Sequence, residues 1–361
     1  MRSLIQRLAL AAVVAAAGIS ACGAGETRYS RQRAQQTLTR LDAAGLVLGE
    51  FTLTKVVDGD TVHVDGLASS LRLVGLDAEE TFKTERDRRD VADWPTYLAS
   101  RRAGGLRPVK MATPMGEEAK QFAKHFLGAG ARVRLERDDP DEIRDRYGRY
   151  LAYVFVEKDG RWVNYNVECV RAGMSPYFSK YGWSKRFHAE LAAAEREARA
   201  ARRGIWDPSR QAYPDYDERK AWWDARAAFV AAFERDAADR RDHVVLSHWD
   251  ALRRLEERVG QEVAVLATVD DVRRGDRGPT RVLLARRMFA DLPVVFFDKD
   301  VLAASGIAAW KGEFVVVRGV VSLYEHRRSH QKELQIVVDR PGQIALSPVP
   351  GLRLPAAEVA P

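Results

Sequence analysis

The chain is poor in cysteine, with only Cys22 and Cys169 among its 361 residues. At most one disulfide can form, and no Cys/His spacing typical of a zinc site occurs in the sequence. Cys169 lies in "YNVECVRAG", which has a helical pattern, so we expect it to be a small residue of a buried core. The alternative is a reactive thiol at this position.

Long apolar runs are also lacking, apart from one at the N-terminus. "MRSLIQRLALAAVVAAAGISAC" has two arginines, a stretch rich in alanine and valine, and small residues before Cys22, as a secretory signal does. The stretch is short for a membrane span. Its ending, "ISAC", resembles the lipobox of bacterial lipoproteins, which is cleaved before the cysteine. We therefore expect an exported lipoprotein of the cell envelope, anchored to a membrane by a lipid on Cys22. A plain signal peptide with an incidental cysteine is the alternative.

Acidic residues are outnumbered by basic ones, so the formal net charge is +7 and the isoelectric point is about 9.4. Removal of the N-terminal signal would leave the chain basic. This balance favours a polyanionic partner, such as nucleic acid or an anionic membrane surface, without choosing between them.

The length of the chain suggests two folded units rather than one. Shifts in composition and pattern predict the following division: a lipoprotein signal peptide at 1–21, a polar tether at 22–50, a first domain at 51–207 with an inserted surface excursion at 82–113, a connecting helix at 208–242 packed on one of the domains, a second domain at 243–346 and a flexible tail at 347–361.

The first domain has the pattern of a β-rich unit with helices. "FTLTKVV", "DTVHVDG" and "SLRLVGLD" alternate apolar and polar residues and predict strands. "MGEEAKQFAKHFLGAG" predicts a helix that ends at Gly128, and "RYGRYLAYVFVEKDGRWVNYNV" predicts a hairpin with its turn at Asp159-Gly160. A further helix is expected from an N-cap at Ser184 to a stop at Gly204.

The second domain shows three strand patterns, a helical piece and two more strand patterns, which is the order of an OB-type barrel. The loop "YEHRRSHQK" joins its last two strands. Arg327, Arg328 and Lys332 with Tyr324 would suit binding of a single strand. A solvated hairpin tip is the alternative.

Carboxylates gather after two of the predicted strands. Asp60 follows the turn in "VVDGDTVHVDG", and Asp77, Glu79 and Glu80 end "LRLVGLDAEET". If the two strands pair, these acids meet at one end of a barrel. Several carboxylate and carbonyl oxygens are what a hard cation such as Ca²⁺ requires. Ordinary acids of solvated turns are the alternative.

Two arginines lie in or beside strands of the same domain, Arg72 in "SLRLVGL" and Arg149 in "RDRYGRY". A guanidinium group binds phosphate through two parallel hydrogen bonds and stabilises charge that develops on it. The alternative is that both lie on a solvated face.

Taken in order, D-G-D-T, R-x4-D-x-x-E-T, R-Y-G-R and an Ala- and Arg-rich helix ending in G-I-W closely resemble the staphylococcal nuclease family. The resemblance covers residues 51–207. It implies a mainly β fold with helices (α+β), in which a five-stranded OB-type nuclease barrel with packed helices precedes the second, small OB-like barrel.

The resemblance assigns Asp60 and Asp77 as Ca²⁺ ligands, together with the backbone carbonyl of Ala78. Glu80 matches the glutamate that contacts the metal through water and is assigned as the general base. The family usually has proline just before this glutamate, whereas this chain has Glu79. We expect Glu79 to affect the pKa of Glu80 or the placement of the metal without removing a ligand.

The resemblance further assigns Arg72 and Arg149 as the arginines that grip the phosphate, and Tyr147 as a tyrosine near the bound nucleotide. A second tyrosine belongs in "MSPYFSKYG", where Tyr177 is our choice and Tyr181 the alternative.

The family resemblance implies a Ca²⁺-dependent nuclease that cleaves DNA and RNA with little sequence preference and leaves 3′-phosphate ends. Its partners would be nucleic acid and, through the lipid, a membrane; we infer no protein partner. The rival interpretation is a non-catalytic, nucleic-acid-binding envelope lipoprotein that uses the same fold.

Overall fold

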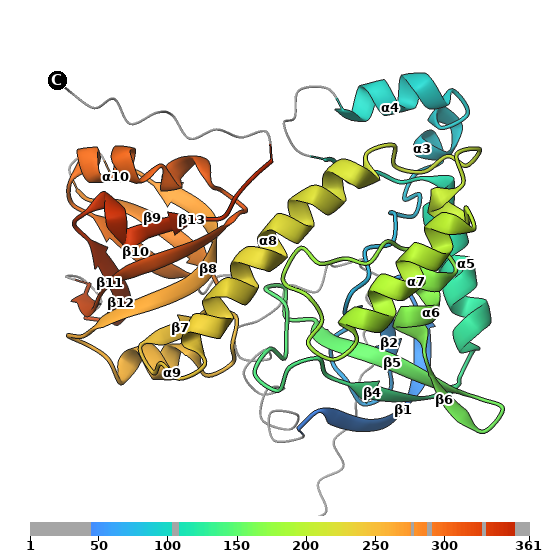
Figure 1. Ribbon diagram of the computed structural model, residues 1–361, viewed down its shortest axis with the longest axis horizontal. Coiled ribbons are helices and arrows are strands. Elements are labelled where there is room, and N and C mark those ends of the chain that lie inside the picture. Colours follow the sequence, from blue (N-terminus) through green and yellow to red (C-terminus); the bar gives the residue numbers. More distant parts are fainter. Residues whose placement is uncertain (1–44, 103–107, 276–277, 287–290, 327–329, 351–361) are drawn as a thin grey trace, which may run out of the picture.

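The computed structural model describes residues 45–102, 108–275, 278–286, 291–326 and 330–350. They form two β-barrels, joined by the long helix α8 (Tyr216–Ala237) that runs between them (Figure 1). None of the helices in these ranges is long and apolar enough to cross a bilayer. The predicted signal sequence and Cys22 lie outside the described residues.

The first barrel is closed and has five strands. Along the sheet the strand order is β3-β2-β1-β4-β5, and a parallel pairing of β3 with β5 closes the ring. Alternate residues, such as Leu71 and Leu73, fill its interior because side chains of a strand point to opposite faces. The strands are β1 (Val47–Val56), β2 (Thr61–Val64), β3 (Leu71–Leu73), β4 (Arg132–Glu136) and β5 (Tyr150–Lys158).

Two sequence predictions meet different outcomes in this barrel. The hairpin is confirmed, since β5 pairs with β6 (Arg161–Asn164) across a turn in which Asp159 and Gly160 have positive φ angles of 49° and 74°. The tether boundary at residue 50 is wrong, because β1 already begins at Val47 and pairs with β4 from that residue. Its first residues, two adjacent apolar side chains followed by Gly49 and Glu50, do not show the alternation of a strand.

Three helices cover the first barrel. α5 (Pro114–Leu127) ends at Gly128 as predicted, and α6 (Tyr165–Arg171) carries Cys169, which is fully buried in the core as expected. α7 (His188–Ala200) begins after the predicted N-cap Ser184. The Ser184 hydroxyl instead accepts a hydrogen bond from the backbone N–H of Phe187, so it stabilises the turn before the helix. A short 3-10 turn, η1 (Gly204–Trp206), follows.

The segment 82–113 is not the irregular surface excursion that its sequence suggests. It forms α3 (Glu85–Asp90) and α4 (Trp94–Arg102). Val91, Tyr97 and Met111 are buried in a small core with residues from η1 and from the start of α8. These apolar residues are spaced too widely among charges to give a recognisable period, so only the folded chain brings them together.

The second barrel repeats the strand order of the first. The order around the sheet is β11-β12-β10-β9-β8, β11 closes on β8, and the β10–β12 pairing is parallel, as β3–β5 is. α10 (Lys299–Ser305) lies between its third and fourth strands, so the predicted order of strands and helix is confirmed. The strands are β8 (Glu262–Arg273), β9 (Thr280–Ala285), β10 (Leu292–Phe296), β11 (Phe314–Glu325) and β12 (Lys332–Val338).

Shorter elements complete the second unit. β7 (His243–Val245) and α9 (Ala251–Glu256) precede the barrel, η2 (Ile307–Ala309) follows α10, and η3 (Pro341–Gln343) with β13 (Ile344–Leu346) closes the described chain. The predicted tail boundary is too early, because Ser347 is fully buried and its carbonyl accepts a hydrogen bond from Trp310 Nε1 at 2.8 Å.

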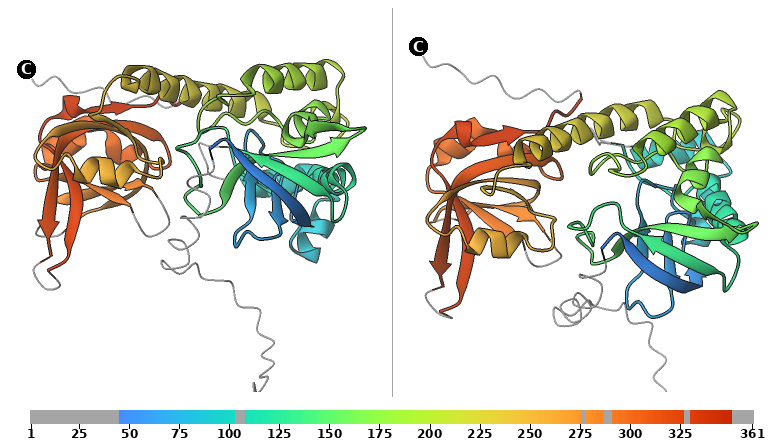
Figure 2. Two further views of the ribbon diagram at one scale, coloured as in Figure 1. Left: turned by 90° about the horizontal axis from the view of Figure 1, so that it is seen from below. Right: turned by 60° about the horizontal axis from the view of Figure 1, so that its bottom comes forward.

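Helix α8 packs on both units rather than on one, as Figure 2 shows. Its start joins the small core around Met111, and its later residue Phe233 is buried with Leu266 and Phe314 of the second barrel. The sequence alone could not show which unit α8 packs on, because apolar side chains alternate with charges around most of the helix.

Candidate active site

The D-G-D turn between β1 and β2 is fixed by close packing at Gly59. A Cβ at this position would lie 2.7 Å from the Cβ of Ala78 and 2.9 Å from that of Ala119. The Gly59 carbonyl accepts a hydrogen bond from the Tyr165 hydroxyl at 2.9 Å. The turn is therefore held against both α5 and the segment that follows β3, which places Asp60 beside that segment.

Arg72 connects the two predicted metal ligands. Leu71 and Leu73 point into the barrel, so Arg72 between them points outward. Its Nη1 forms an ion pair with Asp60, and its Nη2 donates to Asp77 Oδ1 at 2.8 Å. The structure thus brings together three of the predicted site residues, and all three side chains are largely buried.

The backbone holds both carboxylates in place. Asp60 Oδ2 accepts from the N–H of Ala78 at 3.0 Å, and the N–H of Asp77 donates to Ser175 Oγ at 2.9 Å. These buried carboxylate oxygens are the donor type that Ca²⁺ prefers, and the donor set contains no nitrogen or sulfur ligand that would favour a softer metal. The carboxylates of Asp60 and Asp77 therefore fit a hard cation, and the Ala78 backbone adjoins them through the hydrogen bond from its N–H to Asp60.

The electrostatics of the cluster also suit a cation. Burial and the adjacent Asp60 charge raise the pKa of Asp58 to about 7, and Asp58 Oδ1 accepts from the Asp60 N–H at 3.1 Å. Burial alone would raise the pKa of Asp77, but the charges of Lys110 and Arg72 more than offset it and hold that pKa below its usual value. The acids are crowded enough that positive charge must accompany them.

Lys110 supplies part of that charge and was not foreseen from the sequence. Its ammonium forms an ion pair with Asp77 Oδ1, the same oxygen that accepts from Arg72. Lys110 lies in the segment 82–113, for which the sequence predicted only an inserted excursion, so spacing gave no signal for this lysine. Asp58, by contrast, is the first acid of the D-G-D motif and could have been included on that ground.

Glu80 and Glu79 point to different surroundings. Glu80 is held through its backbone, whose carbonyl accepts from the Thr113 N–H at 3.0 Å, and its carboxylate is 35% exposed and pairs with Lys83 at 3.5 Å. The Glu79 carboxylate is buried and accepts from the Tyr213 N–H and the Tyr216 hydroxyl at 2.6 and 2.7 Å. Glu79 thus belongs to the contact with α8, which explains how an acid is accommodated there.

Arg149 directly precedes β5, the strand that pairs with the Arg72 strand β3. Tyr150 faces the interior opposite Leu71 in the parallel β3–β5 pairing, so its predecessor Arg149 faces outward. The Arg149 guanidinium pairs with Asp145 at 2.6 Å rather than with the Asp60–Asp77 cluster, and its carbon lies 5.6 Å from the ring centroid of Tyr147. Tyr147 is 50% exposed, as a residue that contacts a nucleotide must be.

Tyr177 is the prediction that the structure contradicts. Its side chain is 2% exposed, and its hydroxyl is bonded to His188 Nδ1 at 3.0 Å and to the Ser184 N–H at 2.9 Å, so it cannot contact a substrate. The alternative, Tyr181, is 56% exposed, and its ring meets that of Phe178, over which the Arg72 guanidinium lies. Register along an irregular loop cannot be read from sequence, which is why the choice failed.

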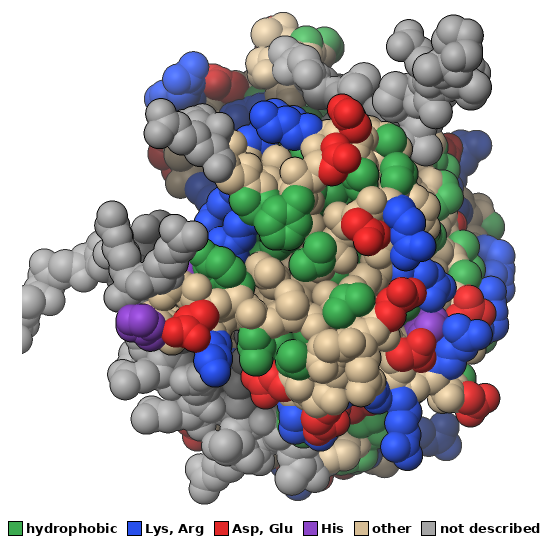
Figure 3. All heavy atoms as spheres, turned by 90° about the vertical axis from the view of Figure 1, so that its left-hand side faces the viewer, with side chains coloured by type: hydrophobic (Ala, Val, Ile, Leu, Met, Phe, Trp, Pro, Cys, Tyr) green, Lys and Arg blue, Asp and Glu red, His purple; other side chains and the backbone are tan. Residues whose placement is uncertain are grey.

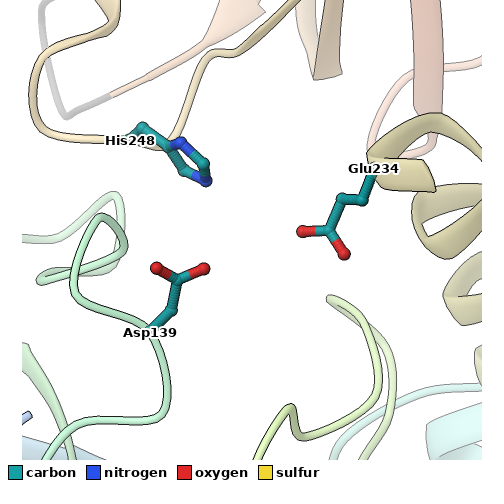
Figure 4. A group of neighbouring side chains, drawn as sticks. All are labelled: Asp139, Glu234 and His248. Carbon is teal, nitrogen blue, oxygen red and sulfur yellow. The ribbon is translucent and has the colours of Figure 1, made fainter. Parts of the chain in front are cut away.

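A second group of possible ligands lies where α8 meets both units. Asp139, Glu234 and His248 point toward one space, with ligand atoms within 4.8 Å of one another (Figure 4). The Lys185 ammonium already pairs with both carboxylates, at 3.0 Å for Glu234. We interpret this group as an ion-paired junction between the units.

The proposed basic patch of the second barrel is only partly described. Arg327 and Arg328 lie outside the described residues, while Tyr324 and Lys332 are exposed. On the outer face of this unit, acidic and basic side chains are interspersed rather than segregated (Figure 3). Binding of a single strand by this loop stays a prediction.

Comparison with known proteins gives a consistent picture for the first barrel. The family model described as "Staphylococcal nuclease homologue" matches residues 70–208. The chain is 30% identical to the thermonuclease of Staphylococcus intermedius over 164 residues, covering 45% of this chain and 79% of the relative. It is 32% identical to the uncharacterized protein MJ1439 of Methanocaldococcus jannaschii over 157 residues, covering 43% and 70%. It is 28% identical to endonuclease YncB of Bacillus subtilis over 164 residues, covering 45% and 64%.

Proposed function

Because this chain belongs to the staphylococcal nuclease family, we propose that it is a nuclease that hydrolyses phosphodiester bonds of DNA and RNA, requires Ca²⁺ and has little sequence preference. The observation that carries the proposal is the convergence of Asp60, Arg72 and Asp77 at one end of the first barrel. These residues differ from ordinary solvated surface residues, because all three side chains are largely buried and joined by ion pairs.

Asp60, Asp77 and the Ala78 carbonyl would hold the cation. When bound, Ca²⁺ supplies positive charge to a phosphate oxygen and stabilises the charge that develops there. Its charge would also replace that of Arg72 at the two carboxylates. Arg72 would then be free to donate to the phosphate, from a position on β3 that already faces out of the barrel.

Arg149 would complete the phosphate grip from the neighbouring strand, exchanging its ion pair with Asp145 for the substrate. Tyr147 and Tyr181, which are both exposed, would contact the nucleotide. The grip of two guanidinium groups is strongest for the doubly charged transition state, which is where it accelerates the reaction.

Glu80 is the proposed general base. Its partly exposed carboxylate can reach a water molecule, unlike the buried Glu79. Glu80 accepts a proton from the water molecule while the oxygen of that water forms a bond to phosphorus. The bond from phosphorus to the 5′ oxygen breaks, and that oxygen takes up a proton from solvent. The products are a 3′-phosphate end and a 5′-hydroxyl end.

We also propose that the chain is exported and anchored to a membrane by a lipid on Cys22. The support is the sequence "ISAC" after a short apolar stretch. The test is the distribution of the protein between membrane and soluble fractions in its host. Cys22→Ser should move it to the soluble fraction, and an unchanged distribution would exclude lipidation at this residue.

The test of the nuclease is degradation of single-stranded and duplex DNA by residues 24–361, in Ca²⁺ and in excess chelator. Glu80→Gln should abolish cleavage, and Glu85→Gln, on the exposed helix α3, serves as the matched control. Cleavage that needs Ca²⁺ and is lost in Glu80→Gln supports the proposal. Binding without cleavage would favour the non-catalytic interpretation, and cleavage indifferent to both changes would place the chemistry elsewhere.

A further inference from the structure

The segment 178–181 lies against the active-site cluster. The Phe178 ring packs beneath Arg72, with 5.8 Å between the ring centroid and the guanidinium carbon. The Tyr181 ring meets the Phe178 ring edge-on, with centroids 5.8 Å apart, so the segment packs together as a unit beside Arg72. A shift of this segment would therefore move the surroundings of Arg72.

Helix α8 holds this segment from the opposite side. The Trp223 ring meets the Phe178 ring edge-on, with centroids 4.9 Å apart. Polar contacts fix the backbone and side chains of the same stretch: Lys220 Nζ donates to the Tyr177 carbonyl at 3.5 Å, Ser179 Oγ donates to Asp224 Oδ1 at 2.8 Å, and Arg226 Nε donates to the Lys180 carbonyl at 2.9 Å.

Arg226 also reaches into the second barrel. Its Nη1 donates to the Gly312 carbonyl at 2.9 Å and forms an ion pair with Glu313, and both charged side chains are 0% exposed. Glu313 accepts a further hydrogen bond from Trp222 Nε1 at 3.0 Å. Gly312 and Glu313 directly precede β11, so one guanidinium group joins the active-site segment to the second barrel.

A buried ion pair of this kind resists displacement, because moving one partner leaves the other charge buried without compensation. Direct packing adds to it, since the rings of Tyr181 and Phe314 are in edge contact with centroids 6.4 Å apart. The segment 178–181 can therefore not shift independently of the second barrel.

We propose that the second barrel fixes the active-site segment 178–181 through Arg226 and Glu313, so that Arg226 is a positioning residue for Arg72. This role rests on the nuclease function proposed for the first barrel. It gives the second unit a part in the reaction of the first, whether or not it binds nucleic acid itself.

The alternative is that α8 merely joins the two units. Phe233 provides the matched control, because it lies on the same helix and packs on the same barrel with Leu266 and Phe314. Phe233→Ala should weaken the apolar contact between α8 and the second barrel while it leaves the hydrogen bonds and the ion pair of Arg226 in place.

The experiment compares Phe233→Ala with the double variant Arg226→Met/Glu313→Gln, both in the full-length chain. The double change removes the buried pair together and leaves no lone charge. We expect its kcat to fall roughly ten- to a hundredfold, with KM and the dissociation constant for Ca²⁺ little changed. Phe233→Ala should keep its kcat at temperatures where both variants are folded.

Hydrogen exchange gives a readout that is independent of activity. Backbone amides of residues 178–182 should exchange faster in the double variant than in Phe233→Ala. If the double variant does not fold, Phe178→Leu removes the ring beneath Arg72 and should give the same loss of kcat. Equal kcat values, or equal exchange in the two interface variants, would overturn the proposal. An inactive wild-type chain would refute the nuclease function instead, and the exchange data would still decide the positioning.

Discussion

Lys110 and Arg72 bind the same oxygen of Asp77, one through an ammonium and the other through a guanidinium group. Lys110 comes from the segment 82–113, and the backbone next to it is held by Tyr213, whose hydroxyl accepts from the Met111 N–H and donates to the Met111 carbonyl. A positive charge attached to the chain thus lies at a carboxylate that we assign to Ca²⁺. The predictions below begin from this pair.

Lys110→Met should strengthen Ca²⁺ binding. The ammonium competes with the ion for Asp77, and its removal should lower the dissociation constant a few-fold, as expected for one partly exposed charge. Titration calorimetry with Ca²⁺ measures this directly. Lys124→Met, on the exposed face of α5, is the control and should leave the constant unchanged. A weaker affinity in Lys110→Met would show that the lysine supports the site rather than competing with the ion.

Gly59→Ala should disrupt the site through sterics alone. The added methyl group would lie 2.7 Å from the Cβ of Ala78, so the D-G-D turn or the Ala78 segment must move. We expect a loss of about 1–3 kcal/mol in the free energy of unfolding and a clear loss of Ca²⁺ affinity. Urea unfolding and calorimetry measure the two effects. Gly342→Ala is the control, because its methyl group would have no atom from another part of the chain within 4 Å. It should change neither the free energy of unfolding nor the Ca²⁺ affinity.

Substitution of Tyr177 should affect the stability of the fold, whereas substitution of Tyr181 should affect activity. Tyr177→Phe removes the hydrogen bonds to Ser184 and His188 and should cost about 1 kcal/mol of stability with little change in kcat. Tyr181→Phe should keep the stability and lower kcat/KM roughly tenfold, because we propose that this side chain, which is 56% exposed, contacts the nucleotide. Thermal unfolding and steady-state cleavage rates distinguish them, and the reverse pattern would restore Tyr177 to the site.

Glu142→Gln should flatten the pH dependence of stability. Burial, reinforced by the charge of Asp139, raises the pKa of Glu142 to about 7, although the Ser247 side chain opposes this. The folded chain thus holds this proton more tightly than the unfolded chain does. The resulting stability is present at pH values below the unfolded pKa and is lost as the pH rises toward 7.

In Glu142→Gln this loss of stability should disappear. At pH 8 the free energy of unfolding of the variant should therefore exceed that of the wild type by at most about 3 kcal/mol. Urea unfolding of both chains at pH 5 and pH 8 provides the measurement, with the exposed Glu85→Gln as the control. Equal pH dependence in wild type and Glu142→Gln would mean that Glu142 is already ionised in the folded chain.

Local pattern was sufficient wherever a feature depends on nearby residues. The alternation around Leu71 and Leu73 predicted β3, Asp159-Gly160 predicted the hairpin turn, and the succession of patterns after residue 243 predicted the second barrel. Pattern failed where distant residues supply the partners. Val91 and Tyr97 are buried by η1 and α8, and Tyr177 is buried by α7, which no local period reveals.

The sequence by itself determined which family the chain resembles. The order of Asp60, Arg72, Asp77, Glu80 and Arg149 carries that resemblance, and the period of a strand predicts that Arg72 faces out of the barrel. Only the tertiary structure decided what surrounds that set. Lys110 at Asp77, Glu79 in the contact with α8, and Arg226 between the active-site segment and Glu313 all join residues far apart in the chain. Such contacts depend on how whole helices and strands pack, which no short segment of the sequence determines.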